Sequence, residues 1–252
     1  MHKKNFGTKV KFLGGGTILT LLVLLFFEAT QPPQTFRETK KILTDIWRSK
    51  DFTTEFYCKA PFQITDNGIK VIQSAQYTPR KALTKKQTIN ERTQNIEFEH
   101  IMPARNFGRH LPCWQKGGRK ACHNDKTFNL MEADPRNLVP AIGEINADRS
   151  NFRYAEAPKS IVYNQYGNCR VYTDFKAKRF YPAHYSKGLI ARTYLYMSET
   201  YNIRLSDQER KLMEAWDKTY PKDEYEEARD NAIAQIPLWK VFYKVQNLFA
   251  KI

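Results

Sequence analysis

The sequence lacks several features that would place a protein in a special class. It contains no internal repeat and no low-complexity segment, which excludes repeat architectures and argues against a disordered chain. No Cys-x-x-Cys pair occurs, and the cysteine spacing matches no common zinc finger. Acidic residues are scarce, since 26 Asp and Glu stand against 41 Lys and Arg. What remains is a basic protein with a formal net charge of +15 at pH 7.

The composition of the 252 residues predicts one globular domain with appendages. A hydrophobic fraction of 41% and an aromatic fraction of 13% are enough to build a substantial core. The excess of basic side chains gives a surface that attracts polyanions, of which nucleic acid and anionic membrane are the usual candidates. Charge alone does not choose between these two partners.

The first 29 residues have the pattern of an export signal. Four lysines precede an apolar run over residues 12–27, which is shorter than the ~20 residues that span a bilayer. We expect cleavage between Ala29 and Pro33, with an uncleaved anchor as the alternative because residues 28–30 make a poor cleavage site. Cleavage would remove four lysines and one glutamate, which lowers the net charge from +15 to +12. The sequence therefore predicts a periplasmic or secreted protein whose N-terminal segment associates transiently with the membrane.

Four cysteines form an even set in a chain that is expected to fold in an oxidising compartment. Two disulfides are therefore expected, among three possible connectivities. We favour the pairing of Cys113 with Cys122 and of Cys58 with Cys169. The alternative is a zinc site formed by Cys113, Cys122 and the adjacent His123.

Local patterns in the first third predict a helix and a hairpin. Thr35 and Glu38 have the capping-box spacing that starts a helix, so residues 30–55 are interpreted as a linker followed by an N-terminal helix. Residues 62–72 resemble two short strands around an Asn-Gly turn. The domain is therefore expected to begin with a β-rich region.

The later segments predict a long loop followed by helices. Residues 105–129 are rich in polar residues and glycine without apolar periodicity, which indicates a functional loop held by a disulfide. A helix is expected over residues 143–152, in which Asn146 and Arg149 share a face that meets the phosphate backbone. The last third is predicted to be helical, and its aromatic stripe, which includes Tyr194, is interpreted as core.

An acid beside a histidine, at residues 99 and 100, is the centre of the functional argument. Metal-assisted hydrolysis of a phosphodiester needs an oxygen ligand for a cation, a base for water, and a positive charge facing phosphorus. Glu99 and Asn146 are the candidate metal ligands. His100 is the candidate base and Arg119 the candidate cation. Glu132 is the candidate carboxylate that orients a metal-bound water or Arg119.

Each of these candidates also has an ordinary structural explanation, such as an ion-paired carboxylate or a solvated loop arginine. Neighbours in a strand point to opposite faces, so Glu99 and His100 share a site only at a strand end, a bulge or a loop. Pro103 indicates such an irregularity. Glu97 is the same-face neighbour of Glu99 and its main rival as a ligand. Asn137 is a weaker candidate for orienting His100.

Several ordered segments carry a resemblance to a known family. They resemble the bacterial periplasmic or secreted endonuclease I family, and the likeness runs from about residue 57 to about residue 236. Their number and length make the resemblance specific. The segments are residues 99–104, 113–120, 131–140, 143–152, 174–178 and 191–197.

The resemblance implies an α+β fold with a ββα-metal (His-Me finger) nuclease core, additional helices and a small mixed sheet over residues 56–236. It implies cleavage of double- and single-stranded DNA, and of RNA, to 5′-phosphate products. The implied cofactor is magnesium, with calcium or manganese as alternatives, held by Glu99 and Asn146. His100 is then the base that activates water, Arg119 the phosphate stabiliser and Glu132 a supporting acid.

The sequence therefore predicts an exported, metal-dependent endonuclease that contacts the nucleic-acid backbone without sequence preference. We expect it to act as a monomer. The main alternative is a non-catalytic exported nucleic-acid-binding protein, which the same charge would serve, and a basic membrane-active protein is a third possibility. The family commonly ends in a tail that contains asparagine and proline, whereas residues 237–252 here form a divergent basic and aromatic tail without an assigned role.

Overall fold

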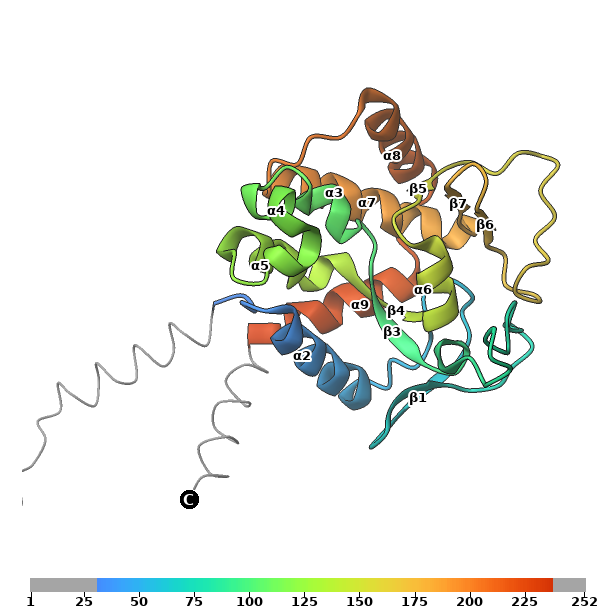
Figure 1. Cartoon of the computed structure of the whole chain (residues 1–252). Coiled ribbons are helices and arrows are strands. Elements are labelled where there is room, and N and C mark those ends of the chain that lie inside the picture. Colours follow the sequence, from blue (N-terminus) through green and yellow to red (C-terminus); the bar gives the residue numbers. More distant parts are fainter. Residues whose placement is uncertain (1–30, 238–252) are drawn as a thin grey trace, which may run out of the picture. The chain divides into compact units, whose positions relative to one another are not determined.

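The structure, a computed structural model, describes residues 31–237, and residues 33–235 form a compact unit (Figure 1). The predicted α+β class is confirmed, because the described residues contain eight α-helices and seven short strands. The predicted signal or anchor, and the tail from residue 238 onward, lie outside the described residues. Within the described range, no helix has both the length and the apolar character that a membrane crossing requires.

Helix α2 (Phe36–Ser49) is the predicted N-terminal helix. The Thr35 side chain accepts a hydrogen bond from the backbone N–H of Glu38, as the capping spacing predicts. Its apolar side is buried, and the Thr39 hydroxyl donates to the carbonyl of Ala133 over 2.6 Å. The helix is thereby part of the compact unit, although its sequence is separated from the segments that suggested the nuclease family. Its buried apolar side chains are Ile42, Leu43, Ile46 and Trp47.

Strands β1 (Phe62–Thr65) and β2 (Gly68–Val71) form the predicted hairpin, with the turn one residue earlier than expected. Thr65 pairs with Gly68, so the two-residue loop is Asp66-Asn67. Gly68 opens the second strand at a φ of 106°, a conformation that side chains disfavour and glycine permits. Gly68 therefore supports the turn as the first residue of β2 and not as a residue of the loop.

The centre of the unit is an antiparallel pair of strands followed directly by a helix. Strand β3 (Ile96–His100) pairs with β4 (Leu138–Ile142), and β4 is buried along its whole length. Helix α6 (Gly143–Arg149) begins where β4 ends and contacts both strands. The helix is shorter than the predicted 143–152, because Ser150 adopts a φ of 52° and leaves the helical region.

The long loop predicted for residues 105–129 is wrong, because this segment forms three short helices. They are α3 (Ala104–Gly108), α4 (Pro112–Ala121) and α5 (Lys126–Glu132). Phe107 of α3 and Phe128 of α5 are buried with their ring centroids 5.5 Å apart. This contact joins two helices that are each too short to show a periodic apolar pattern.

Both predicted disulfides are present. Cys113 is joined to Cys122 across α4, and Cys58 is joined to Cys169. With all four cysteines paired, the alternative zinc site of Cys113, Cys122 and His123 has no thiolate ligands and is excluded.

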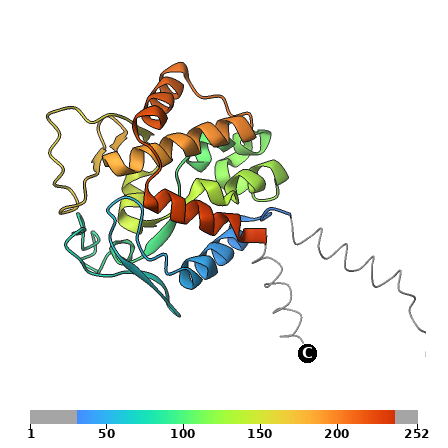
Figure 2. The same cartoon turned by 180° about the vertical axis from the view of Figure 1, so that it is seen from behind.

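The rest of the unit is a small mixed sheet, as the resemblance implied, and a group of helices, as predicted for the last third. Figure 2 shows α9 (Glu224–Ala234) crossing the face turned away in Figure 1, and α9 contacts α2. Helix α7 (His184–Thr200) packs against α8 (Asp207–Thr219), and Tyr194 is buried, which confirms the interpretation of the aromatic stripe as core at that position. The remaining elements are β5 (Arg153–Tyr154), β6 (Tyr172–Asp174), β7 (Arg179–Tyr181), η1 (Glu91–Thr93) and η2 (Pro135–Asn137).

Candidate active site

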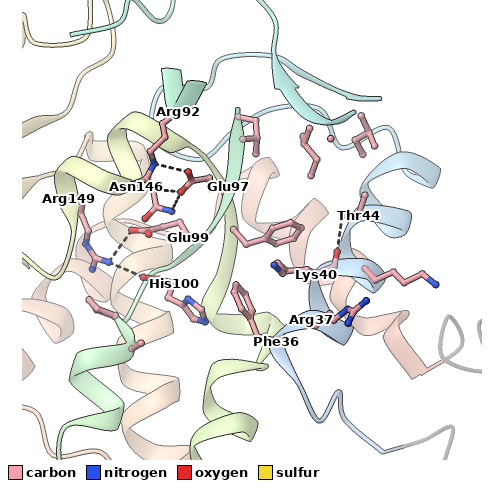
Figure 3. A pocket seen from close by; sticks show the side chains of 18 of the residues that line it. Phe36, Arg37, Lys40, Thr44, Arg92, Glu97, Glu99, His100, Asn146 and Arg149 are labelled. Atoms are coloured by element: carbon pink, nitrogen blue, oxygen red, sulfur yellow. Dashed lines mark hydrogen bonds and ion pairs between the residues drawn. The ribbon is translucent and has the colours of Figure 1, made fainter. Parts of the chain in front are cut away.

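A groove of about 960 Å³ lies along the free edge of strand β3. Its walls come from α2, from the β1–β2 hairpin and from the start of α3. Four of the five predicted site residues line it, namely Glu99, His100, Arg119 and Asn146, and Figure 3 shows three of them side by side. The fifth, Glu132, is bonded to Arg119.

The edge position of β3 explains how an acid and the histidine after it reach one groove. Strand β3 pairs with β4 along one side, and all five of its residues line the groove along the other. Glu99 and His100 therefore point to opposite faces of the strand and still border the same space. His100 is also the last residue of β3, so of the three irregularities expected here, a strand end, a bulge or a loop, the structure shows a strand end.

His100 is buried and held in one orientation. Its Nε2 lies 2.8 Å from the carbonyl oxygen of Glu132, and its ring packs 4.8 Å from that of Phe36, centroid to centroid. A carbonyl only accepts, so the proton is on Nε2 and the lone pair is on Nδ1. Burial lowers the pKa of His100 to about 3, and Arg119 and Arg149 add to this effect. The imidazole is therefore neutral at physiological pH and has a nitrogen free to accept a proton.

The low pKa of His100 predicts a loss of stability in acid. The unfolded chain takes up this proton near pH 6.5, whereas the folded protein does so only near pH 3. Below pH 6.5, His100 should therefore destabilise the fold by up to about 1.4 kcal/mol for each pH unit. Urea unfolding of the wild type and of His100→Asn, at pH 7 and at pH 5, isolates this contribution. The wild type should lose more stability than the variant between these two pH values, and an equal loss would contradict the expected neutral state.

Of the two candidate ligands, Glu99 is buried and Asn146 is partly exposed. Its Oε1 accepts hydrogen bonds from the Tyr57 hydroxyl over 2.9 Å and from Arg149 Nη1 over 3.0 Å. Burial raises the pKa of Glu99, and the Arg149 guanidinium offsets part of that rise. The other oxygen, Oε2, accepts no hydrogen bond from any of the residues that the structure describes. One carboxylate oxygen is therefore fixed and the other is left for the groove.

Asn146 is oriented by the acid that rivalled Glu99 as a ligand. The Asn146 amide donates from Nδ2 to Glu97 Oε2 over 2.9 Å. Both oxygens of Glu97 also accept from Arg92, so the carboxylate is occupied. The amide oxygen of Asn146 points away from Glu97, and Figure 3 shows it on the side of Glu99. The arrangement makes Glu97 a positioning group for Asn146.

Glu99 Oε2 and the amide oxygen of Asn146, neither of which accepts a hydrogen bond from a described residue, fit a hard cation. A carboxylate oxygen and an amide oxygen are typical ligands of magnesium, which keeps several waters and takes few protein ligands. Among residues 31–237, no cluster of three or more His, Cys, Asp or Glu side chains is placed to bind a metal. A metal at Glu99 and Asn146 would therefore be held by one carboxylate, one amide and water.

Arg119 follows a break in α4 and faces the same groove. Gly118 has a φ of 67°, which separates the two halves of the helix and directs Arg119 toward α5. Arg119 Nε donates to Glu132 Oε1 over 2.5 Å, and the arginine side chain is 49% exposed. Its terminal nitrogens donate to none of the described residues, so they are available for phosphate oxygens. Glu132 thus holds Arg119 through its side chain and His100 through its carbonyl.

Two expectations about neighbouring residues are wrong. Arg149 was predicted to face a phosphate backbone with Asn146, but its guanidinium is fully buried. It donates to Glu99 and to the carbonyls of His100 and Ile101, so its role is internal. The Asn137 side chain is not hydrogen-bonded to His100 but to both backbone groups of Met102, so it does not orient the imidazole through a hydrogen bond.

Removing the Cys113–Cys122 disulfide should lower activity more than removing the other disulfide does. The bond encloses Arg119, and its loss should destabilise the fold by about 2–3 kcal/mol. The Cys58–Cys169 bond closes a longer loop, with a separation of 111 residues, and neither cysteine lines the groove. Plasmid cleavage by Cys113→Ala/Cys122→Ala and by Cys58→Ala/Cys169→Ala, at a temperature where both are folded, provides the comparison. If Cys113→Ala/Cys122→Ala is as active as the other variant, or as the wild type, the Cys113–Cys122 disulfide does not support the position of Arg119.

Comparison with known proteins shows the family of the chain. The family model described as Endonuclease I matches residues 35–238. The chain belongs to the Endonuclease I family. A "Periplasmic deoxyribonuclease" of Aeromonas hydrophila is 44% identical over 222 residues, which cover 86% of this chain and 88% of that protein. The family match begins at the N-terminal cap of α2, so it includes the helix that forms one wall of the groove.

Two further relatives cover a similar share of the chain. An "Endonuclease-1" of Buchnera aphidicola subsp. Baizongia pistaciae is 42% identical over 202 residues, covering 80% of this chain and 79% of its own. An "Extracellular endonuclease" of Pseudomonas fluorescens biotype A is 32% identical over 221 residues, covering 83% and 87%. The predicted membership of the endonuclease I family is thus confirmed.

Proposed function

We propose that this Endonuclease I protein hydrolyses phosphodiester bonds in DNA, and in RNA, without sequence preference and leaves 5′ phosphates. The names of its relatives, a periplasmic deoxyribonuclease and an extracellular endonuclease among them, support DNA as a substrate and a location outside the cytoplasm. The two disulfides agree with folding in an oxidising compartment. The observation that carries the proposal is a neutral histidine beside two unused oxygens and a half-exposed arginine in one groove.

The roles of the residues follow from their contacts. His100 Nδ1 accepts a proton from the attacking water while Nε2 stays bonded to Glu132. Arg119 binds the phosphate and is oriented by Glu132. Glu99 and Asn146 would hold a magnesium ion, with calcium or manganese as alternatives, and Glu97 orients Asn146. A bound ion would supply polarisation of the phosphate and stabilisation of the charge on the departing oxygen.

The strand pair and the helix after it supply the framework of the proposed site. In our proposal, β3, β4 and α6 form the ββα-metal core, in which the last residues of β3 provide Glu99 and His100. Asn146 comes from the middle of α6. Since the groups come from adjacent, packed elements, their relative positions are fixed before substrate binds.

Plasmid cleavage with and without a chelator tests the proposed activity. The oxidised protein should nick and then degrade supercoiled plasmid in magnesium, and an excess of EDTA should abolish cleavage. Plasmid that stays intact in magnesium would contradict the proposed nuclease activity and favour a non-catalytic nucleic-acid-binding protein. Leakage of anionic vesicles that persists in His100→Ala would instead favour a membrane-active protein. Cleavage that persists unchanged in EDTA would contradict the role given to Glu99 and Asn146.

A further inference from the structure

One side of helix α2 forms a wall of the groove along the helix length. Phe36, Lys40, Thr44 and Arg48 follow each other at intervals of four residues, and all line the groove. Arg37 lines it as well, and Figure 3 shows Phe36, Arg37, Lys40 and Thr44 on α2, across the groove from Glu99 and Asn146. Residues four apart lie on one face of a helix, so the wall is a continuous row.

The opposite side of α2 fixes the direction of this row. Ile42 and Ile46 are buried in the core on that side, and Trp47, beside the row, stacks on Phe98 of β3 with ring centroids 4.8 Å apart. The Thr39 hydroxyl is bonded to the carbonyl of Ala133. Rotation of the helix would expose these apolar side chains and break this bond, so the row remains turned toward the groove.

The row starts at the catalytic end of the groove. The ring of Phe36 contacts that of His100, and the guanidinium of Arg119 lies 5.5 Å from the Phe36 centroid. From Phe36 to Arg48, twelve residues at 1.5 Å per residue give a distance of roughly 18 Å along the helix. Phosphates of one DNA strand follow each other every ~3.4 Å along the duplex axis, so the row is long enough for several of them.

The charge of the row is positive. Arg37 and Arg48 are exposed, and the Lys40 ammonium lies 4.9 Å from the centroid of Phe36. Asp45 is the acid that lines the groove from α2, and it forms an ion pair with Arg48 over 3.3 Å. This surface pair is weak, so Arg48 can exchange Asp45 for a phosphate at small cost. Cations in a row, rather than in a cluster, match charges spaced along a strand.

We propose that the groove-facing side of α2 binds the phosphates of the substrate strand on one side of the bond that is cut. The proposal rests on the proposed nuclease function, because it assumes that the scissile phosphate lies at His100 and Arg119. It assigns to α2 the binding of an extended strand, while the hydrolysis remains with the groups of β3, α4 and α6. The contacts are to the backbone, so they add affinity without sequence preference.

The salt dependence of binding tests this assignment. In a His100→Ala background, Arg37→Gln/Lys40→Gln/Arg48→Gln is compared with the control Lys85→Gln/Lys86→Gln/Lys218→Gln. The control removes the same charge at three exposed lysines that do not line the groove. Binding of a fluorescein-labelled 12-nucleotide single strand is measured by anisotropy between 50 and 300 mM salt. Each lost phosphate contact lowers the slope of log K against log salt by about 0.7, so the α2 variant should lose about 2.

The outcomes separate this proposal from the proposed function. Equal slopes for the α2 variant and the control would overturn the role of α2. The same substitutions with His100 intact should raise the KM for the 12-nucleotide strand about tenfold or more and leave kcat within about twofold. If the wild-type protein cleaves no plasmid, the proposed nuclease function is wrong. A smaller salt slope in the α2 variant than in the control would still support α2 as a binding surface for phosphates. Should the triple variant melt early, Arg37→Gln/Arg48→Gln, with both residues exposed, gives the same test with about two thirds of the effect.

Discussion

Replacing His100 with alanine is expected to lower kcat for plasmid cleavage by a factor of about 10² to 10⁴, the usual contribution of a general base. The neutral ring has its Nδ1 lone pair free, and the described residues that line the groove include no second histidine. The binding groups remain in place, so KM should change little. Initial rates of nicking at saturating plasmid measure the effect directly.

A control must separate the loss of the base from the loss of packing. His100 contacts Phe36 and Phe107, so alanine leaves a space in the structure. His100→Asn keeps more of the volume and should be as inactive as the alanine variant. His184→Ala removes an exposed histidine outside the groove and should keep its activity. A rate within about threefold of the wild type for His100→Ala would contradict the assigned role.

Replacing Arg149 with methionine should destabilise the fold by about 3–5 kcal/mol, because breaking a buried ion pair leaves the remaining charge uncompensated. Arg149 is fully buried, and its partner Glu99 is only 3% exposed. The carbonyls of His100 and Ile101 would also lose the donors that now bind them. Denaturant unfolding at pH 7 measures the difference in the free energy of unfolding.

The exposed pair of Arg48 with Asp45 provides the matched control for stability. Arg48→Met should change the free energy of unfolding by less than about 1 kcal/mol, as surface pairs usually do. The double variant Glu99→Gln/Arg149→Met removes both charges and should recover part of the stability that Arg149→Met loses. A loss below about 1 kcal/mol in Arg149→Met would show that this pair does not hold the site together.

The parts of the fold that could be predicted depend on local chemistry. The cap of Thr35 on Glu38 and the Asn-Gly signal near residue 67 act within a few residues, and both structures form nearly as predicted. The helices between residues 104 and 132 could not be recognised in the same way. Each is short, and Phe107 meets Phe128 only after the chain folds back. Stability from such tertiary contacts leaves no periodic pattern in the sequence.

The candidate site likewise contains features that the sequence predicted and features that only the structure shows. The likeness to endonuclease I gave the order of the chemical groups, and the structure brings Glu99, His100, Arg119 and Asn146 to one groove. Spacing on a predicted helix placed Arg149 beside Asn146 on a solvent face, because spacing describes a face and does not say what covers it. The structure covers Arg149 with β3 and the tyrosines around Glu99. The apolar residues of α2 were the sequence signal that this helix packs against the domain.

The fixed oxygen of Glu99 has a consequence for metal choice. Tyr57 and Arg149 both bind Oε1, so the carboxylate can offer only Oε2 to an ion and cannot act as a bidentate ligand. Large ions such as calcium gather six to eight oxygens and often take both from one carboxylate, whereas magnesium accepts single oxygens in an octahedron completed by water. In the proposed site, the two hydrogen bonds that hold Glu99 Oε1 would therefore favour the smaller ion.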